Sequence, residues 1–72
     1  GALRQIYFRQ RTYYFKHERY TASLKKLNLM KTPVEGVPWP PKIMVTPSGW
    51  EAELVFGNNS MYIRKDGKVW GN

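Results

Sequence analysis

Cysteine is absent from this 72-residue sequence, so neither a disulfide framework nor a thiolate metal site can hold its fold together. No apolar run reaches the roughly 18 residues that a membrane-spanning helix needs. The N-terminus also lacks the basic, apolar and small-residue segments of a signal peptide. Because the chain starts with Gly1 and not with Met, we expect Gly1 to be a remnant of tag removal and the chain to be cut from a larger protein.

Side chains that do chemistry are also scarce. The sequence has one histidine and five acidic residues, with no nucleophile motif and no glycine-rich phosphate loop. His17 fits a packed, hydrogen-bonded residue at a helix end better than a general base. Glu51 and Glu53 share one face of an expected strand and fit a solvated face better than an acid–base pair. We therefore predict a protein that is not an enzyme, with no catalytic residue, metal site or cofactor.

The sequence does contain enough apolar and aromatic surface to fold. Hydrophobic residues make up 42% of the chain and aromatic residues 15%, far from the composition of disordered proteins. A chain this short holds one core at most, which predicts a single small domain over residues 1–72. The net charge of +7 is uneven, because residues 1–31 carry eight Lys or Arg and only one acidic residue. Such a patch attracts phosphate, acidic polysaccharide or anionic lipid.

The first segment has the pattern of an amphipathic helix. There is no Gly or Pro from Leu3 to about Tyr20. One face at helical spacing carries Leu3, Ile6, Tyr7, Gln10, Tyr13, Tyr14 and His17. Arg9, Thr12 and Lys16 fall elsewhere and are expected in solvent.

A short turn and a proline-rich crossover are expected to follow this helix. Residues 21–27 predict a second, short helical turn with Thr21 or Ser23 as its N-cap and with Leu24 and Leu27 pointing inward. Four of the five prolines lie within residues 33–41, which favours an extended, turn-rich segment over helix or central strand.

The remainder of the chain has the pattern of an antiparallel meander. Strand-like runs separated by turn clusters cover residues 42–46, 50–56, 61–64 and 68–70. The Asp66–Gly67 pair favours a type I′ hairpin between the last two runs. In the second run the apolar Trp50, Ala52, Leu54 and Phe56 alternate with Glu51, Glu53 and Val55. We therefore predict an α+β fold of two layers, with the helix packed on one face of a three- to four-stranded antiparallel sheet.

One stripe of the helix is apolar where solvent is expected. Phe8 and Phe15 lie seven residues apart and share the side opposite the main apolar face with Arg4, Arg11 and Arg19. Two explanations are open at this point. Either the proline-rich segment wraps around this side of the helix, or the stripe is a docking face for another domain.

The three tryptophans form a second candidate set. Trp39 lies between two prolines, Trp50 begins an expected strand, and Trp70 is close to the C-terminus. Each fits either a lid on the core or a platform for a ligand, because flat aromatic rings pack against the apolar faces of sugars and stack on bases.

Two stretches of the chain resemble a known family. Residues 3–27 are similar to the C-terminal module that follows the sugar-binding domain in bacterial carbohydrate-binding family 9-like proteins, and residues 63–70 resemble that family's ending. The aromatic-rich helix followed by Tyr20-Thr-Ala-Ser-Leu24 also looks like type IV pilins and pseudopilins, which place a helix against an antiparallel sheet. Here the helix lacks the long apolar tail of a pilin. The first resemblance implies that the sugar contacts lie on a preceding domain, so it assigns no binding residue to this chain.

These observations lead to one functional hypothesis and one alternative. We expect a non-catalytic accessory module of a bacterial carbohydrate-binding protein, located in the periplasm, at the outer membrane or outside the cell. Its expected partners are the preceding carbohydrate-binding domain, docked on the stripe of Phe8, Phe15 and Arg11, and a polysaccharide. The alternative is nucleic-acid or polyanion binding through the basic aromatic helix, although no recognised nucleic-acid-binding motif supports it.

Overall fold

A single helix opens the fold. The computed structural model describes all 72 residues, and its helix, α1, spans Ala2–His17, ending before the expected Tyr20. Glu18 ends the helix by taking a left-handed conformation with φ 56°, while its N–H donates to the Tyr14 carbonyl at 2.8 Å. Tyr20 then stacks on Tyr14, with ring centroids 4.6 Å apart. α1 is neither long nor apolar enough to cross a membrane.

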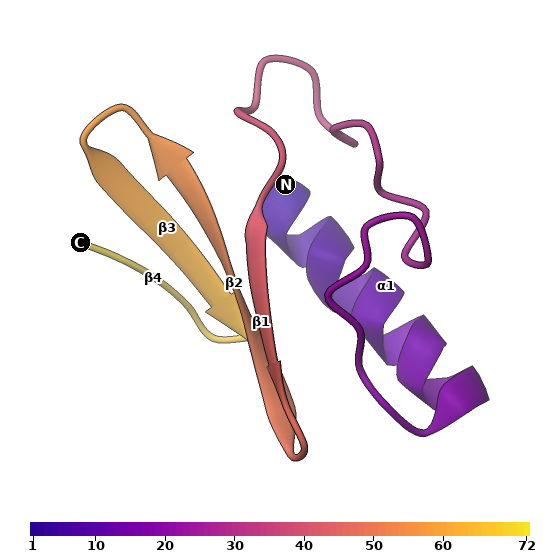
Figure 1. The fold of residues 1–72 in the computed structure, drawn as a ribbon. Helices are drawn as coiled ribbons and strands as arrows, with labels where there is room; N and C mark the ends of the chain where they lie inside the picture. Colours follow the sequence, from indigo (N-terminus) through magenta and orange to yellow (C-terminus); the bar gives the residue numbers. More distant parts are fainter.

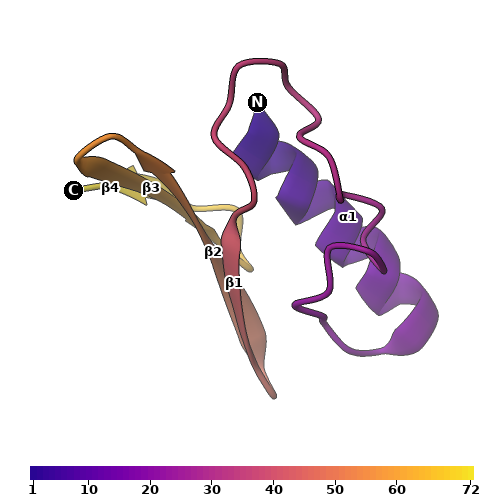
Figure 2. The same cartoon turned by 45° about the horizontal axis from the view of Figure 1, so that its top comes forward.

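Residues 18–41 contain neither helix nor strand. The expected second turn is one hydrogen-bonded turn, in which the Leu27 N–H donates to the Ser23 carbonyl at 3.1 Å. The Lys26 N–H donates to Ser23 Oγ at 3.2 Å, so Ser23 caps the turn. Leu27 is buried and Leu24 is half-buried. Figures 1 and 2 show this segment running back along α1 before it enters the sheet.

The second half of the chain forms a four-stranded antiparallel sheet in the order β1-β2-β3-β4. The strands are β1 (Lys42–Thr46), β2 (Gly49–Phe56), β3 (Asn59–Arg64) and β4 (Val69–Gly71). Each strand pairs with the one before it, which confirms the predicted meander. Ala52 lies at the centre of the inner face, paired with Ile43 on one side and Ile63 on the other.

The turn between β3 and β4 differs from the expected type I′ hairpin. Of its residues only Gly67 has a positive φ, 87°, whereas a type I′ turn needs two in succession. The Gly67 N–H donates to the Arg64 carbonyl at 2.8 Å, and the Arg64 N–H donates to the Lys68 carbonyl at 3.1 Å. The loop therefore has three residues, with Gly67 in the left-handed position of a bulge.

The helix covers one face of the sheet, and this two-layer arrangement confirms the predicted α+β fold (Figure 1). In β2, Trp50, Ala52 and Leu54 are buried, which confirms the alternation along this strand. Phe56 was expected on the covered face but is half-exposed, because it lies at the end of β2 beside an open groove. One core cluster joins helix, turn and sheet through Ile6, Tyr13, Leu27, Leu29, Trp50, Ala52 and Ile63.

The covered face of α1 is narrower than its sequence pattern predicts. Tyr14 and His17 are exposed, although their spacing placed them with the buried residues. Tyr14 lies about 100° around the helix from the buried Tyr13, so the sheet does not cover it. His17 follows at the last helical position, where it packs on the Tyr13 ring with centroids 4.3 Å apart.

Two polar side chains of α1 hold the returning segment in place. Gln10 is fully buried; its Nε2 donates to the Thr21 carbonyl at 2.6 Å, and its Oε1 accepts from the Thr21 N–H at 3.1 Å. The expectation that Arg9 is in solvent is wrong. Arg9 is half-buried because its Nη1 donates to the carbonyls of Leu27 at 3.2 Å and Asn28 at 3.4 Å. These contacts satisfy carbonyls at the end of the short turn.

Candidate binding surfaces

The solvent-facing side of α1, opposite the buried Ile6, carries two phenylalanines and two arginines. This outer stripe consists of Arg4, Phe8, Arg11 and Phe15. Phe15 is 90% exposed and Phe8 is 49% exposed, and both lie opposite the buried Ile6. The two rings border a shallow hollow of about 310 Å³ together with Arg11 and Thr12. The outer stripe is thus apolar and basic at once, and open to solvent.

The proline-rich segment packs elsewhere, so it does not explain the outer stripe. Trp39 rests against the core, and its Nε1 donates to the Leu29 carbonyl at 2.9 Å. Pro41 is buried at the entry to β1. Of the two explanations open from the sequence, wrapping of the stripe by this segment is therefore wrong, since Phe15 is left almost fully exposed.

The three tryptophans do not come together into one platform. Trp50 is 5% exposed and belongs to the core, so it has no ring face to offer a ligand. Trp39 is half-buried and tied to Leu29, as a lid on the core. Only Trp70 lies on the outer face of the sheet, paired with Tyr62 of β3. The two rings are stacked, with centroids 5.2 Å apart and planes 15° apart.

A connected set of side chains surrounds Trp70. The guanidinium carbon of Arg64 lies 5.9 Å from the Trp70 ring centroid. Arg64 Nε and Nη2 each donate to the Asp66 carboxylate at 3.0 Å. Asn72 Nδ2 donates to the Tyr62 hydroxyl at 3.3 Å. These residues form the Trp70 cluster, which consists of Tyr62, Arg64, Asp66, Trp70 and Asn72.

The ion pair in this cluster predicts an unusually acidic carboxyl group. The Arg64 side chain, together with the Lys68 N–H that donates to Asp66 at 3.0 Å, lowers the pKa of Asp66 from 3.8 to about 2. Because the folded-state pKa is depressed, the pair stabilises the fold above the ordinary pKa, and this contribution is lost as pH falls through about 3.8 to about 2. We expect an NMR titration of the Asp66 carboxyl carbon to give a midpoint of about 2. In Arg64→Gln the midpoint should move toward the ordinary value, and an unchanged midpoint would contradict the pairing.

Titratable side chains do not gather into a catalytic or metal-binding group. No three His, Cys, Asp or Glu residues are placed to hold a metal ion. His17, the one histidine, is exposed at the end of α1. Glu51 and Glu53 lie on the outer face of the sheet, paired with Arg64 and Tyr62 respectively.

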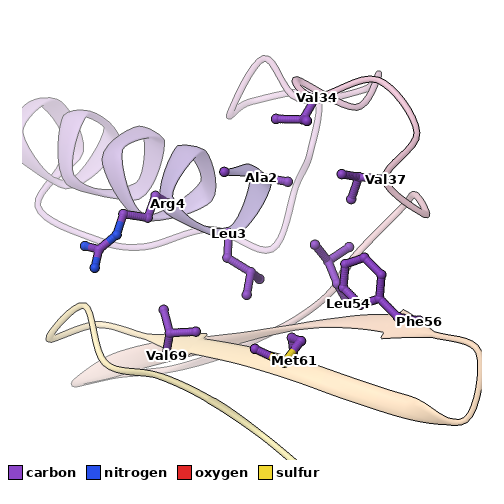
Figure 3. Close-up of a pocket in the computed structure, with 10 residues that line it drawn as sticks. Ala2, Leu3, Arg4, Val34, Val37, Leu54, Phe56, Met61 and Val69 are labelled. Carbon is purple, nitrogen blue, oxygen red and sulfur yellow. The ribbon is translucent and has the colours of Figure 1, made fainter.

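An apolar groove of about 480 Å³ opens between the start of α1, residues 34–37 and one end of the sheet. Figure 3 shows Val34 and Val37 on one side of it and Phe56 and Met61 on the other. Arg4 is the one charged side chain among its lining residues. Such a groove provides apolar contact but no nucleophile or base.

A smaller, basic cleft lies between α1 and the short turn. It has a volume of about 220 Å³, and no carboxylate lines it. Its basic residues are Arg9, Lys16, His17 and Lys26. The cleft concentrates part of the positive charge that the sequence places in residues 1–31.

Sequence reasoning missed Tyr62, Asn72 and Gln10 as residues that organise these surfaces. Tyr62 pairs with Trp70 only in the register that the three-residue turn sets. A two-residue turn at Asp66–Gly67 would instead place Trp70 opposite Ile63, on the core face. The pairing of Gln10 with Thr21 joins residues with no shared periodicity, so no local signal could have indicated it.

The comparisons with known proteins leave the family of this chain open. No protein-family model, no curated protein and no solved structure matches it. The resemblances to carbohydrate-binding family 9-like modules and to pilins therefore stay predictions. The α+β fold and the placement of the surfaces rest on the structure itself.

Proposed function

We propose that this chain is a non-catalytic interaction module that docks another protein domain through the outer stripe of α1. The observation that carries the proposal is the 90% exposure of Phe15, on the side of the helix opposite the core. Single exposed apolar side chains are common on proteins, but Phe8 and Phe15 form a patch with a polar rim, which is typical of interaction surfaces. The hollow between Phe8 and Phe15 is a concave surface against which a side chain of the partner can pack.

The spacing of the outer stripe favours a helical partner. Its members follow one another at intervals of four, three and four residues, the alternation by which one helix packs along another. Phenylalanine and arginine alternate in this series, so a complementary surface needs apolar and acidic groups side by side. A second copy of α1 would bring like charges together, because the helix carries arginine and lysine and no acidic residue, and this disfavours self-association.

The nature of the partner is proposed from the sequence resemblance. We propose that the partner is the carbohydrate-binding domain that precedes the module in a bacterial cell-envelope or secreted protein. In this proposal the module supports that domain, and its helix-on-sheet core supplies a rigid base for the stripe.

The double substitution Phe8→Ser plus Phe15→Ser tests this function. Both side chains are at least half-exposed, so the free energy of unfolding should change by less than about 0.5 kcal/mol per site. Affinity for the preceding domain, measured by NMR titration of the labelled module, should fall by at least about tenfold, because aromatic anchors dominate interfaces. Thr12→Ser, on the rim of the same hollow, is the matched control and should bind normally.

Two outcomes would contradict docking through the outer stripe. One is normal binding by the double variant. The other is a large loss of stability in the isolated module, which would mean that the two rings belong to its own core.

Polyanion binding is a second candidate, favoured by the basic cleft of Arg9, Lys16, His17 and Lys26. Four cationic or titratable groups without a carboxylate attract phosphate or sulfate groups. Titration with a heparin oligosaccharide at two salt concentrations separates the candidates. Polyanion binding weakens steeply with salt, whereas contacts of the phenylalanine rings depend on it little.

A further inference from the structure

The outer face of the sheet carries its own aromatic surface, on the opposite side of the molecule from the outer stripe. We infer that the Trp70 cluster is a binding platform for an uncharged polysaccharide built from flat, equatorially linked pyranose rings. The indole of Trp70 would stack on the apolar face of one sugar ring, and the polar members of the cluster would bind its hydroxyl groups. This inference does not depend on the docking proposed for α1.

The indole is held in a fixed orientation on this face. Tyr62 stacks on it at 5.2 Å, and the Arg64 guanidinium lies 5.9 Å from its centroid. Both contacts come from β3, on one side of Trp70, and β4 is the edge strand with no strand beyond it. The opposite side of the indole therefore has no neighbouring strand to cover it. An aromatic ring fixed before binding loses little conformational entropy when a ligand stacks on it.

The neighbours of the indole are themselves fixed. The bidentate bond to Asp66 orients Arg64, and the bond from Asn72 orients the Tyr62 hydroxyl. Side chains that only kept this face soluble would not need hydrogen bonds that join them to one another. Preorganised polar groups around an aromatic surface are what recognition of a polyhydroxy ligand uses, because each hydroxyl both donates and accepts.

A row of paired side chains supports the indole from behind. Lys42 pairs with Glu53, Glu53 with Tyr62, and Tyr62 with Trp70, so these four residues cross all four strands on the outer face. The whole row lies on the β3 side of Trp70, where Tyr62 already stacks on the indole. The face left for a sugar ring is therefore the one at the β4 edge of the sheet.

The charges on this face favour a neutral ligand over a polyanion. Glu51 and Glu53 border the cluster, and Asp66 lies within it. Against these three carboxylates the outer face carries Lys42 and Arg64, so it has no excess of positive charge to attract phosphate or sulfate groups, although the rings alone would stack equally well on nucleobases. Arg64 is already engaged by Asp66, so it is not a free phosphate ligand. The excess basic charge lies in residues 1–31 instead, on the other layer.

The test is an NMR titration of the isotope-labelled chain with cellohexaose, xylohexaose and hexa-N-acetylchitohexaose, three uncharged β-linked oligosaccharides, at millimolar concentration. We expect saturable shifts of the Trp70 indole N–H and of the Tyr62 and Arg64 amides with at least one of them. Trp70→Ala should lower the affinity by about tenfold or more, the effect typical of removing one stacking ring. Arg64→Gln, which keeps the indole but loses its support, should lower it by a smaller factor.

The controls separate this inference from the docking function. Phe8→Ser plus Phe15→Ser should leave sugar binding unchanged, whereas Trp70→Ala should leave docking of the preceding domain unchanged. Dispersed amide spectra of Trp70→Ala and Arg64→Gln check that the fold is intact. The inference is overturned if none of the three sugars shifts the Trp70 indole, if shifts gather at Trp39 instead, or if single-stranded DNA shifts the cluster while the sugars do not.

Discussion

Replacing Ile63 by alanine should lower the free energy of unfolding by about 2 to 5 kcal/mol. Ile63 is fully buried, pairs with Ala52 and Val69, and belongs to the cluster that joins the sheet to α1. Deleting its branched side chain removes apolar contacts from both layers and leaves a cavity that a short chain fills poorly. A domain of this size has only about 4 to 11 kcal/mol of stability, so this single substitution removes a large fraction of it. Urea denaturation followed by circular dichroism measures the change.

Two further substitutions test whether the loss of stability in Ile63→Ala comes from packing in the core. Ile63→Val removes one methylene group and should cost about 0.5 to 1.5 kcal/mol. Val55→Ala, on the same sheet but half-exposed on its outer face, should cost less than about 1 kcal/mol, the span of strand propensity. Equal losses for Ile63→Ala and Val55→Ala would mean that the inner face of the sheet is not the core.

The layers of this fold are predictable because they depend on periodicity alone. Alternation in β2 separates Trp50, Ala52 and Leu54 from Glu51 and Glu53, and the structure buries the first group. The spacing of Ile6, Gln10 and Tyr13 likewise identifies the covered side of α1. A buried face produces this periodic spacing in the sequence because every residue on it meets the same apolar environment.

Register is where prediction from sequence is weakest. The Asp66–Gly67 pair indicates a tight turn between β3 and β4, but not whether its loop has two residues or three. One residue decides which face Trp70 occupies, because a shift by one position moves every side chain of the strand to the other side. The observed loop places Trp70 beside Tyr62 and away from Ile63, so the Trp70 cluster could be identified only from the structure.

The outer stripe, in contrast, was predictable from the sequence, because its position does not depend on strand register. Phe8 and Phe15 lie on one helix without turns between them, so their common direction follows from helical geometry. What the sequence left open was whether residues 28–41 cover them, since packing of an irregular segment has no periodic signal. The exposure of both rings in the structure answers that question.

The two surfaces face away from each other, and this arrangement suits an accessory module. The outer stripe belongs to α1 and the Trp70 cluster to the outer face of the sheet, and the core joins the two layers between them. Figure 2 shows the helix and the sheet as these two layers. A partner docked on one surface leaves the other free. Docking and sugar binding, as proposed, are therefore compatible in the same molecule, and variants of one surface serve as controls for the other.

Replacing Gln10 by leucine should lower the free energy of unfolding by roughly 2 to 3 kcal/mol, although leucine has a similar volume and is more apolar. Gln10 is fully buried and bonds both the carbonyl and the N–H of Thr21, so leucine leaves both backbone groups without a partner. The segment that follows α1 should detach locally, with faster hydrogen exchange at the Thr21 amide. Thermal unfolding and hydrogen exchange measure the two effects, and Thr12→Ala on the exposed side of α1 is the control.

The variant Gln10→Glu distinguishes loss of these bonds from loss of packing. An ionised carboxylate can accept from the Thr21 N–H but meets the Thr21 carbonyl without a proton to donate, whereas a protonated carboxyl makes both bonds as glutamine does. Burial and the facing carbonyl raise the pKa of the introduced carboxyl, so this variant should be most stable in acid and lose stability as pH rises through that pKa. A stability that does not depend on pH in this variant, together with unchanged exchange at Thr21 in Gln10→Leu, would show that the amide pairing does not hold the segment on α1.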